Sequence, residues 1–210
     1  MSFGIIGALR LWPQYPEANF NYAIFLETLN DRAGALMRYE QAIKQRADYI
    51  DARLRFANLL AEVGKGAEAE RQYQEVLRLR PGYAEAHNNY GVFLEKRGEP
   101  ASAEQQYLQA LELRQDYAEA HYNYAMLLES VNETKAEEHY RAALQALPSY
   151  AEAHNNLAIL LSERGDLQRA EEHYLAALRL RPRDPQTNYI CSFFAGKRRQ
   201  AGGGQAFPAR

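Results

Sequence analysis

Cysteine is nearly absent from the sequence, and long apolar runs are missing altogether. The single cysteine, Cys191, excludes an internal disulfide framework and is typical of a reducing compartment, so we expect a cytoplasmic protein. No apolar run approaches the about 20 residues that span a bilayer, so we expect no membrane association. A formal net charge of −2 gives no electrostatic reason to expect nucleic acid as a partner.

Catalytic motifs are also lacking. No nucleophile elbow, phosphate loop or paired-carboxylate arrangement stands out, so we expect no enzymatic activity and no cofactor. Five histidines recur in register along the chain: His87, His121, His154, His139 and His173. None has another histidine at the i, i+4 spacing of a helical metal site, so we expect them to pack and to bind no metal.

The sequence does contain a repeated phrase. Tyr-Ala-Glu-Ala-His-x-Asn begins at Tyr83, Tyr117 and Tyr150, with a spacing of 34 and then 33 residues. Looser copies begin at Pro16 and Ile50. Such a period is typical of arrays in which each unit buries its apolar face against its neighbours, and the exposed surface of an array favours binding.

Each unit contains two helical patterns separated by a turn. In the unit from Ala84 the break is Gly98-Glu99-Pro100, where glycine can end one helix and proline can start the next. Asp116 with Glu119 has the spacing of a capping box, as has Ser149 with Glu152, so we expect helices to start there. One tyrosine recurs in each second helix and is expected in the core: Tyr39, Tyr73, Tyr107, Tyr140 and Tyr174.

The unit from Ala151 resembles the tetratricopeptide repeat (TPR) family. The signature positions are filled by Leu157, Ala158, Leu161, Gly165, Ala170, Tyr174, Ala177 and Pro182. The resemblance implies an all-α fold, a right-handed superhelical solenoid of antiparallel helical hairpins. It covers residues 16–184 as five units that start at residues 16, 50, 84, 118 and 151.

The ends of the chain are interpreted separately. Residues 1–15 resemble the end of a second helix, and therefore a partial repeat. Residues 185–196 are predicted to form a sixth first helix that acts as a C-terminal cap. Residues 197–210, which are basic and glycine-rich, are expected to be disordered.

The resemblance also implies where a ligand binds. In the TPR family the first helices line a concave groove that holds extended peptides or helices. One aligned position of that groove carries Asn21, Arg55, Asn89, Asn123 and Asn156. This row resembles the asparagine ladder in the TPR region of O-linked N-acetylglucosamine transferase, in which amides hold the peptide main chain. The alternative is that the amides only bridge neighbouring helices.

Other side chains are expected beside the ladder: Asn88, Tyr122, Met126 and Asn155. A parallel row is acidic: Glu17, Asp51, Glu85, Glu119 and Glu152. The expected partner is therefore a protein or peptide with a basic or neutral segment. The lysine and arginine clamp by which some family members hold acidic chaperone tails is not assembled here.

Two other functions remain open from the sequence. The array could self-associate into a homo-oligomer through apolar ends, for which Ile190, Phe193 and Phe194 are the candidate contact residues. Alternatively, the chain could be the regulatory TPR region of a larger enzyme. A protein-interaction scaffold or adaptor is the function that the repeats favour.

Overall fold

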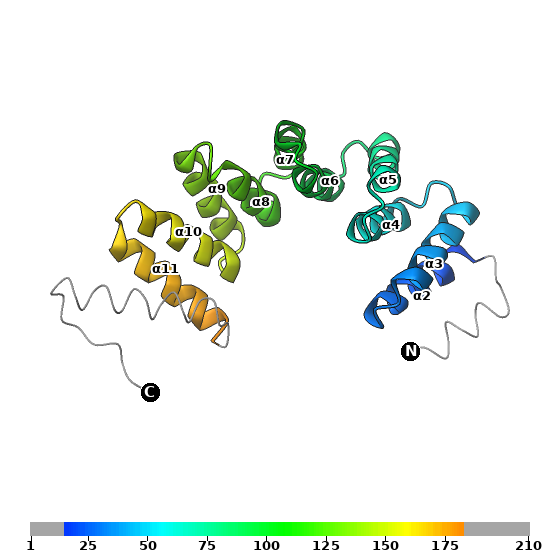
Figure 1. Cartoon of the computed structure of the whole chain (residues 1–210), viewed down its shortest axis with the longest axis horizontal. Coiled ribbons are helices and arrows are strands. Elements are labelled where there is room, and N and C mark those ends of the chain that lie inside the picture. Colours follow the sequence, from blue (N-terminus) through cyan, green and yellow to red (C-terminus); the bar gives the residue numbers. More distant parts are fainter. Residues whose placement is uncertain (1–14, 183–210) are drawn as a thin grey trace. The chain divides into compact units, whose positions relative to one another are not determined.

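The structure is a computed structural model that describes residues 15–182. This part of the chain forms ten α-helices and no strand, which confirms the predicted all-α class (Figure 1). The first helices of successive hairpins are α2 (Pro16–Thr28), α4 (Ile50–Glu62), α6 (Ala84–Lys96), α8 (Ala118–Leu128) and α10 (Ala151–Glu163). The second helices are α3 (Arg32–Gln45), α5 (Gly66–Leu79), α7 (Pro100–Leu113), α9 (Glu133–Ala146) and α11 (Leu167–Leu180).

Several predicted features lie outside the described residues. These are the partial repeat of residues 1–15, except its last residue, the sixth first helix, the tail, and the candidate end contacts Ile190, Phe193 and Phe194. Within residues 15–182, none of the helices has both the length and the apolar character needed to cross a bilayer.

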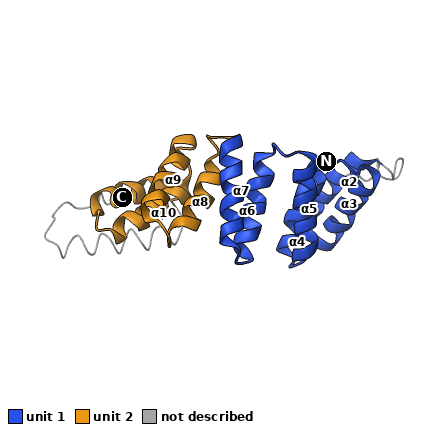
Figure 2. Ribbon diagram, turned by 90° about the horizontal axis from the view of Figure 1, so that it is seen from above, with its two compact units in different colours: residues 1–113 blue, residues 114–210 orange. Residues whose placement is uncertain are grey.

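The hairpins belong to two compact units. Helices α2 to α7 form unit 1, and α8 to α11 form unit 2 (Figure 2). Within each unit, the two helices of a hairpin pack on each other more extensively than on the neighbouring hairpins. The hairpin is therefore the basic packing element.

In each hairpin, the tyrosine of the second helix is buried in the core. The five predicted core tyrosines are at most 2 % exposed, which confirms their place in the core. A small residue of the first helix is buried at the aligned position of every hairpin: Ala23, Ala57, Gly91, Ala125 and Ala158. A large side chain at this position would separate the helices, so the small residue sets how closely they approach.

The hydroxyl groups of these tyrosines also have partners on the first helices. The Tyr107 hydroxyl donates a hydrogen bond to a Glu95 carboxylate oxygen at 2.8 Å. Tyr39 donates in the same way to Glu27, and Tyr140 to Glu129. In the α4–α5 hairpin, where Ala61 replaces that glutamate, Tyr73 donates to Asn58 Oδ1 at 2.8 Å. The burial of each of these four hydroxyls is thereby compensated by a hydrogen bond.

The turn between α6 and α7 has the predicted chemistry. Gly98 adopts a φ of +78°, and Pro100 is the first residue of α7. The α2–α3 turn has Asn30 at the matching position, with a φ of +58°. Asparagine is one of the few non-glycine residues that adopt this left-handed conformation readily, so the two turns are equivalent.

The two capping boxes predicted from the sequence are wrong. The N-cap residues of α8 and α10 are Tyr117 and Tyr150, and neither makes a side-chain cap. Each helix begins one residue later than the box requires, so Asp116 and Ser149 lie outside it. Side-chain caps occur instead at second helices: Asp31, Asn132 and Asp166 accept hydrogen bonds from the amides of Gly34, Lys135 and Arg169.

Candidate functional site

The five side chains of the predicted ladder occupy the same position on the five first helices. In each unit, we call the part of the surface that carries these residues the ladder face; they are Asn21, Arg55 and Asn89 in unit 1, and Asn123 and Asn156 in unit 2. Asn21 and Arg55 are exposed, and the other three are half-buried. Unit 1 contains the first three of these residues, and unit 2 contains the last two. Each unit therefore presents its own accessible part of the ladder.

Asn156 is held by its neighbours. Its Nδ2 donates to the hydroxyl of Tyr122 at 3.2 Å and to the hydroxyl of Tyr140 at 3.4 Å. The amide thus ties α10 to α8 and α9, which is the bridging alternative at this one position. Its Oδ1 is the atom left to accept a hydrogen bond from a peptide amide.

The side chains expected beside the ladder differ in their accessibility. Met126 is 40 % exposed, and Tyr122 is half-buried. Asn88 is only 5 % exposed and donates to Asn89 Oδ1 at 3.2 Å, so it supports its neighbour and presents little surface of its own. Asn155 is half-buried, and the described residues offer no hydrogen-bond donor to its buried Oδ1.

The acidic row beside the ladder is partly neutralised within the chain. Glu17 pairs with Arg46 at 2.6 Å. Glu152 pairs with Arg181 at 2.5 Å. Both arginines directly follow the second helix of the same hairpin. The acidic character of the face is therefore uneven along the chain.

A polar side chain ties each first helix to the preceding turn and to its own second helix. In α4, Arg53 donates to the Ala47 carbonyl and to Gln72 Oε1, both at 2.8 Å. The position is filled by Asn19, Arg53, His87, His121 and His154. These side chains act through hydrogen bonds, so their recurrence has a structural reason.

In unit 2 this tie is a pair of histidines. The two Nδ1 atoms of His121 and His139 are 2.9 Å apart, and so are those of His154 and His173. His121 Nε2 lies 2.9 Å from the Gln115 carbonyl oxygen, which can only accept. His121 Nε2 therefore donates to this carbonyl oxygen. Of the two facing Nδ1 atoms one donates and the other accepts, so at least one ring of each pair is neutral. Sequence spacing missed these pairs because their members lie on different helices.

Burial lowers the pKa of three of these histidines. Burial, with the charges of His121 and Lys135, lowers the pKa of His139 to about 4. Burial also lowers the pKa of His154, although its hydrogen bond to the Pro148 carbonyl acts in the opposite direction. Burial, with the charges of His154 and Arg141, lowers the pKa of His173, and Glu137 opposes this effect. The folded protein thus favours neutral rings.

We expect the free energy of unfolding to fall as the pH is lowered from about 6.5 towards 4. In this window the unfolded chain binds protons that the folded histidine pairs do not, so stability is present above it and lost within it. We expect a loss of about 1–2 kcal/mol, because solvent screens these half-buried groups. Urea denaturation at pH 7 and pH 5 measures it.

The chain contains its own control for this prediction. The α6–α7 hairpin has Gln106 where the other two have His139 and His173, and its side-chain amide lies 2.8 Å from His87 Nδ1. The double variant His139→Gln, His173→Gln should keep the ties and lose most of the pH dependence. An equal pH dependence in both proteins would show that the histidine pairs are not its cause.

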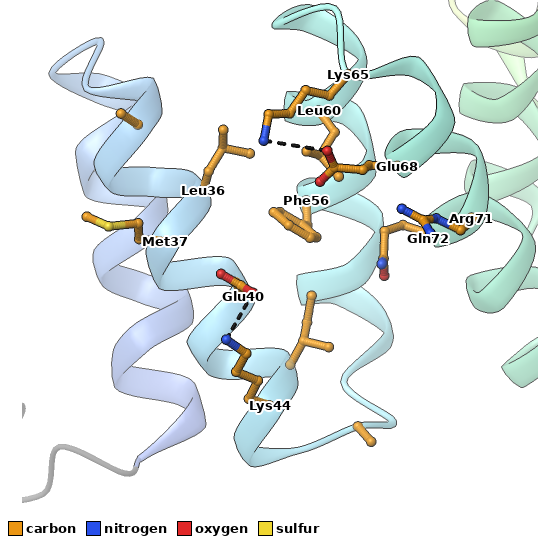
Figure 3. Close-up of a pocket in the computed structure, with 13 residues that line it drawn as sticks. Leu36, Met37, Glu40, Lys44, Phe56, Leu60, Lys65, Glu68, Arg71 and Gln72 are labelled. Atoms are coloured by element: carbon orange, nitrogen blue, oxygen red, sulfur yellow. Dashed lines mark ion pairs between the residues drawn. The ribbon is translucent and has the colours of Figure 1, made fainter.

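A groove of about 990 Å³ lies in unit 1 (Figure 3). None of the ladder residues lines it. Leu36, Phe56 and Leu60 form its apolar part, and Lys44–Glu40 and Lys65–Glu68 ion pairs lie at its edge. This groove was not predicted from the sequence. The pair Leu36-Met37 could have indicated it, because this pair is apolar where the other second helices are charged or polar. The aligned pairs there are Glu70-Arg71, Glu104-Gln105, Glu137-Glu138 and Glu171-Glu172. Met37 is 62 % exposed.

The part of the chain that the structure describes contains no cluster of three or more histidine, cysteine or acidic side chains that could hold a metal ion. The accessible features described above for residues 15–182 are the ladder face and the groove of unit 1.

Comparisons with known proteins agree with this architecture. No curated protein sequence matches the chain. The solved structure of MamA is 21 % identical, with a TM-score of 0.63, and the match covers 75 % of this chain and 93 % of MamA. YrrB, described as a TPR protein with an unusual peptide-binding site, is 20 % identical, with a TM-score of 0.62 and coverages of 92 % and 97 %. PilF of Pseudomonas aeruginosa is 16 % identical, with a TM-score of 0.76 and coverages of 90 % and 93 %. At these identities the likeness shows a shared fold.

The family assignment rests on the sequence itself. The tetratricopeptide repeat family model matches residues 54–118 and 134–185, which together are more than half of the chain. The match includes residues of all the hairpins from α4–α5 to α10–α11. The chain therefore belongs to the tetratricopeptide repeat family.

Proposed function

We propose that the protein is an interaction scaffold that binds an extended peptide on its ladder face. The observation that carries this proposal is the recurrence of an accessible side-chain amide at one position of α2, α6, α8 and α10, with Arg55 at that position of α4. Membership of a family of helical repeats supports an association role. The peptide-binding site named for YrrB, a protein of the same fold, supports a peptide as the partner.

The chemistry of the ladder suits the main chain of a peptide. A carboxamide both donates and accepts, so it can pair with the N–H and C=O groups that an extended peptide leaves unpaired. In unit 1, Asn21 carries such an amide, and Asn89 carries one whose Oδ1 also accepts from Asn88. In unit 2, Asn123 lies at the same position, and Asn156 has its Oδ1. Recognition of the main chain gives affinity with little dependence on the peptide sequence.

Side chains beside the amides can add selectivity. In unit 2, Met126 is exposed, and methionine adapts its shape to different apolar partners. Asp51 and Glu119 of the acidic row are exposed. A peptide with alternating apolar and basic residues therefore complements the face better than an acidic peptide.

Peptide-display panning tests the proposal. The double variant Asn89→Ala, Asn123→Ala removes one amide from each unit and should weaken binding of an enriched peptide about tenfold or more, because each lost hydrogen bond costs about 0.5–1.5 kcal/mol. Fluorescence anisotropy measures the dissociation constant, and circular dichroism checks that the variant stays helical.

The matched control is Gln105→Ala with Gln145→Ala. These two exposed amides lie on the second helices α7 and α9 of the same two hairpins. Binding should be unchanged in this control. If both double variants bind the peptide as the unaltered protein does, the ladder face is not the binding surface.

A further inference from the structure

A repeated pair of side chains follows the second helices. An arginine lies over the ring of a tyrosine three residues further along the chain. The distance from the arginine Cζ to the ring centroid is 3.6 Å for Arg46–Tyr49, 4.7 Å for Arg80–Tyr83 and 3.3 Å for Arg114–Tyr117. A guanidinium over a tyrosine ring is attracted by the negative face of the ring. The repeat thus has a fixed position for a cation.

In the first hairpin an acidic residue completes this position. Arg46, besides stacking on Tyr49, pairs at 2.6 Å with Glu17 in the first turn of the same hairpin. In the last hairpin Arg181 pairs with the aligned Glu152 at 2.5 Å, although the residue three positions further along is Asp184 instead of a tyrosine. The cation of the first hairpin therefore lies between an aromatic ring and a carboxylate, both of which favour positive charge.

The α8–α9 hairpin lacks this cation. Leu147 occupies the arginine position, ahead of Tyr150. Its φ and ψ of −137° and 88° match those of Arg46, at −138° and 99°, and those of Arg80, at −142° and 80°. The Tyr150 amide donates to the Leu147 carbonyl at 3.1 Å, as the Tyr49 amide does to the Arg46 carbonyl. The backbone is therefore the same, and only the side chain differs.

The remaining parts of the position are present. Tyr150 is half-buried, and the Tyr122 ring lies beside it with a centroid distance of 4.9 Å. Glu119 takes the place of Glu17 in this hairpin and is exposed, and no arginine or lysine among residues 15–182 forms an ion pair with it. Leu147 carries no charge, so it does not supply the guanidinium that the first three hairpins place over the ring.

The electrostatic surroundings of Tyr150 agree with an unfilled cation position. Burial raises the pKa of the Tyr150 hydroxyl, and the charges of Tyr122, Glu119 and Glu152 raise it further. The surroundings thus disfavour another negative charge. Glu152 already has Arg181 as its partner, so Glu119 is the carboxylate available to an incoming cation.

We propose that the ring of Tyr150 and the carboxylate of Glu119 bind an arginine side chain of the partner peptide. This inference rests on the proposed function, because it places one residue of a peptide bound on the ladder face of unit 2. The partner's guanidinium takes the place that Arg46 takes in the first hairpin. Asn123 and Asn156 hold the main chain on the same pair of first helices, and Tyr150–Glu119 selects the side chain.

A variant of the chain that supplies its own arginine at this position tests the inference. Leu147→Arg should supply the missing cation, and Leu147→Gln is the control that changes the apolar side chain without adding charge. Panning should enrich an arginine at one peptide position on the unaltered protein and on Leu147→Gln, but not on Leu147→Arg. The dissociation constant of the enriched peptide should rise about fivefold to thirtyfold in Leu147→Arg.

Replacing the peptide arginine by citrulline, its neutral isostere, completes a double-mutant cycle. The citrulline peptide should bind the unaltered protein and Leu147→Arg equally. Equal weakening of both peptides by Leu147→Arg would overturn the inference, because the loss would then not depend on the guanidinium.

The outcomes separate this inference from the proposed function. Peptides without a preferred arginine that lose affinity in Asn89→Ala, Asn123→Ala would support the ladder and overturn the arginine position. No enrichment of any peptide would contradict both. Circular dichroism of Leu147→Arg should show unchanged helicity, since the same residue occupies the same backbone conformation at Arg46 and Arg80.

Discussion

Replacing Glu137 by alanine should lower the free energy of unfolding by about 2–3 kcal/mol. Glu137 is a buried carboxylate of α9, only 7 % exposed. It accepts hydrogen bonds from three arginines: Arg141, Arg164 at 2.5 Å and Arg169 at 3.2 Å. Arg164 follows α10, and Arg169 belongs to α11, so this one side chain joins two hairpins of unit 2. Its loss leaves three neighbouring cations without their shared anion.

Urea denaturation of the variant measures this effect. Glu138→Ala is the control, because Glu138 is exposed on the same helix and should change stability by less than about 0.5 kcal/mol. The effect of Glu137→Ala should persist in 0.5 M salt, since screening acts mainly on exposed charges. Equal stabilities of the two variants would mean that the arginine cluster does not hold the hairpins together.

Replacing Gly91 by alanine should destabilise unit 1 by about 1–3 kcal/mol. A Cβ atom at Gly91 would lie 2.6 Å from Cε1 and 2.8 Å from Cδ1 of Tyr107. The Tyr107 ring is fully buried, and its hydroxyl is fixed by Glu95, so it has little freedom to move away. The other hairpins have alanine at this position, but α6 and α7 approach too closely for one.

Thermal denaturation compares this variant with Gly66→Ala. Gly66 is the first residue of α5, and an added Cβ meets no atom within 4 Å. Alanine there should be neutral or stabilising by up to about 1 kcal/mol, because it restricts the unfolded chain. A stabilising effect at both positions would show that the α6–α7 hairpin has room that the structure does not contain.

The class of fold and the core could be predicted from the sequence, because the same apolar and small residues recur at the same spacing in every unit. A tyrosine that recurs once per unit can only occupy equivalent places, so Tyr39, Tyr107 and Tyr140 identify one layer of the core. The first residue of each helix was harder to predict from the sequence. Asp116 and Ser149 have good cap chemistry, yet each helix begins one residue later, and local spacing contains no information on that shift.

The candidate site was predictable in its positions but not in its contacts. Adjacent residues of a helix point about 100° apart. The alignment assigned the adjacent residues Asn88 and Asn89 to the same face, but they point in different directions and Asn88 is buried. The Asn156 bridge to Tyr122 and Tyr140 spans 34 and 16 residues of sequence and joins three helices, so no local pattern predicts it. The role of the ladder in binding stays a prediction.

Photo-crosslinking can show whether the first helices form the binding surface. A peptide enriched by panning would carry a benzophenone in place of each residue in turn, and mass spectrometry would locate the crosslinks. We predict crosslinks on the first helices, close to Asn89 in unit 1 or close to Asn123 and Asn156 in unit 2. Crosslinks confined to Leu36, Met37 and Phe56, around the groove of unit 1, would contradict this prediction.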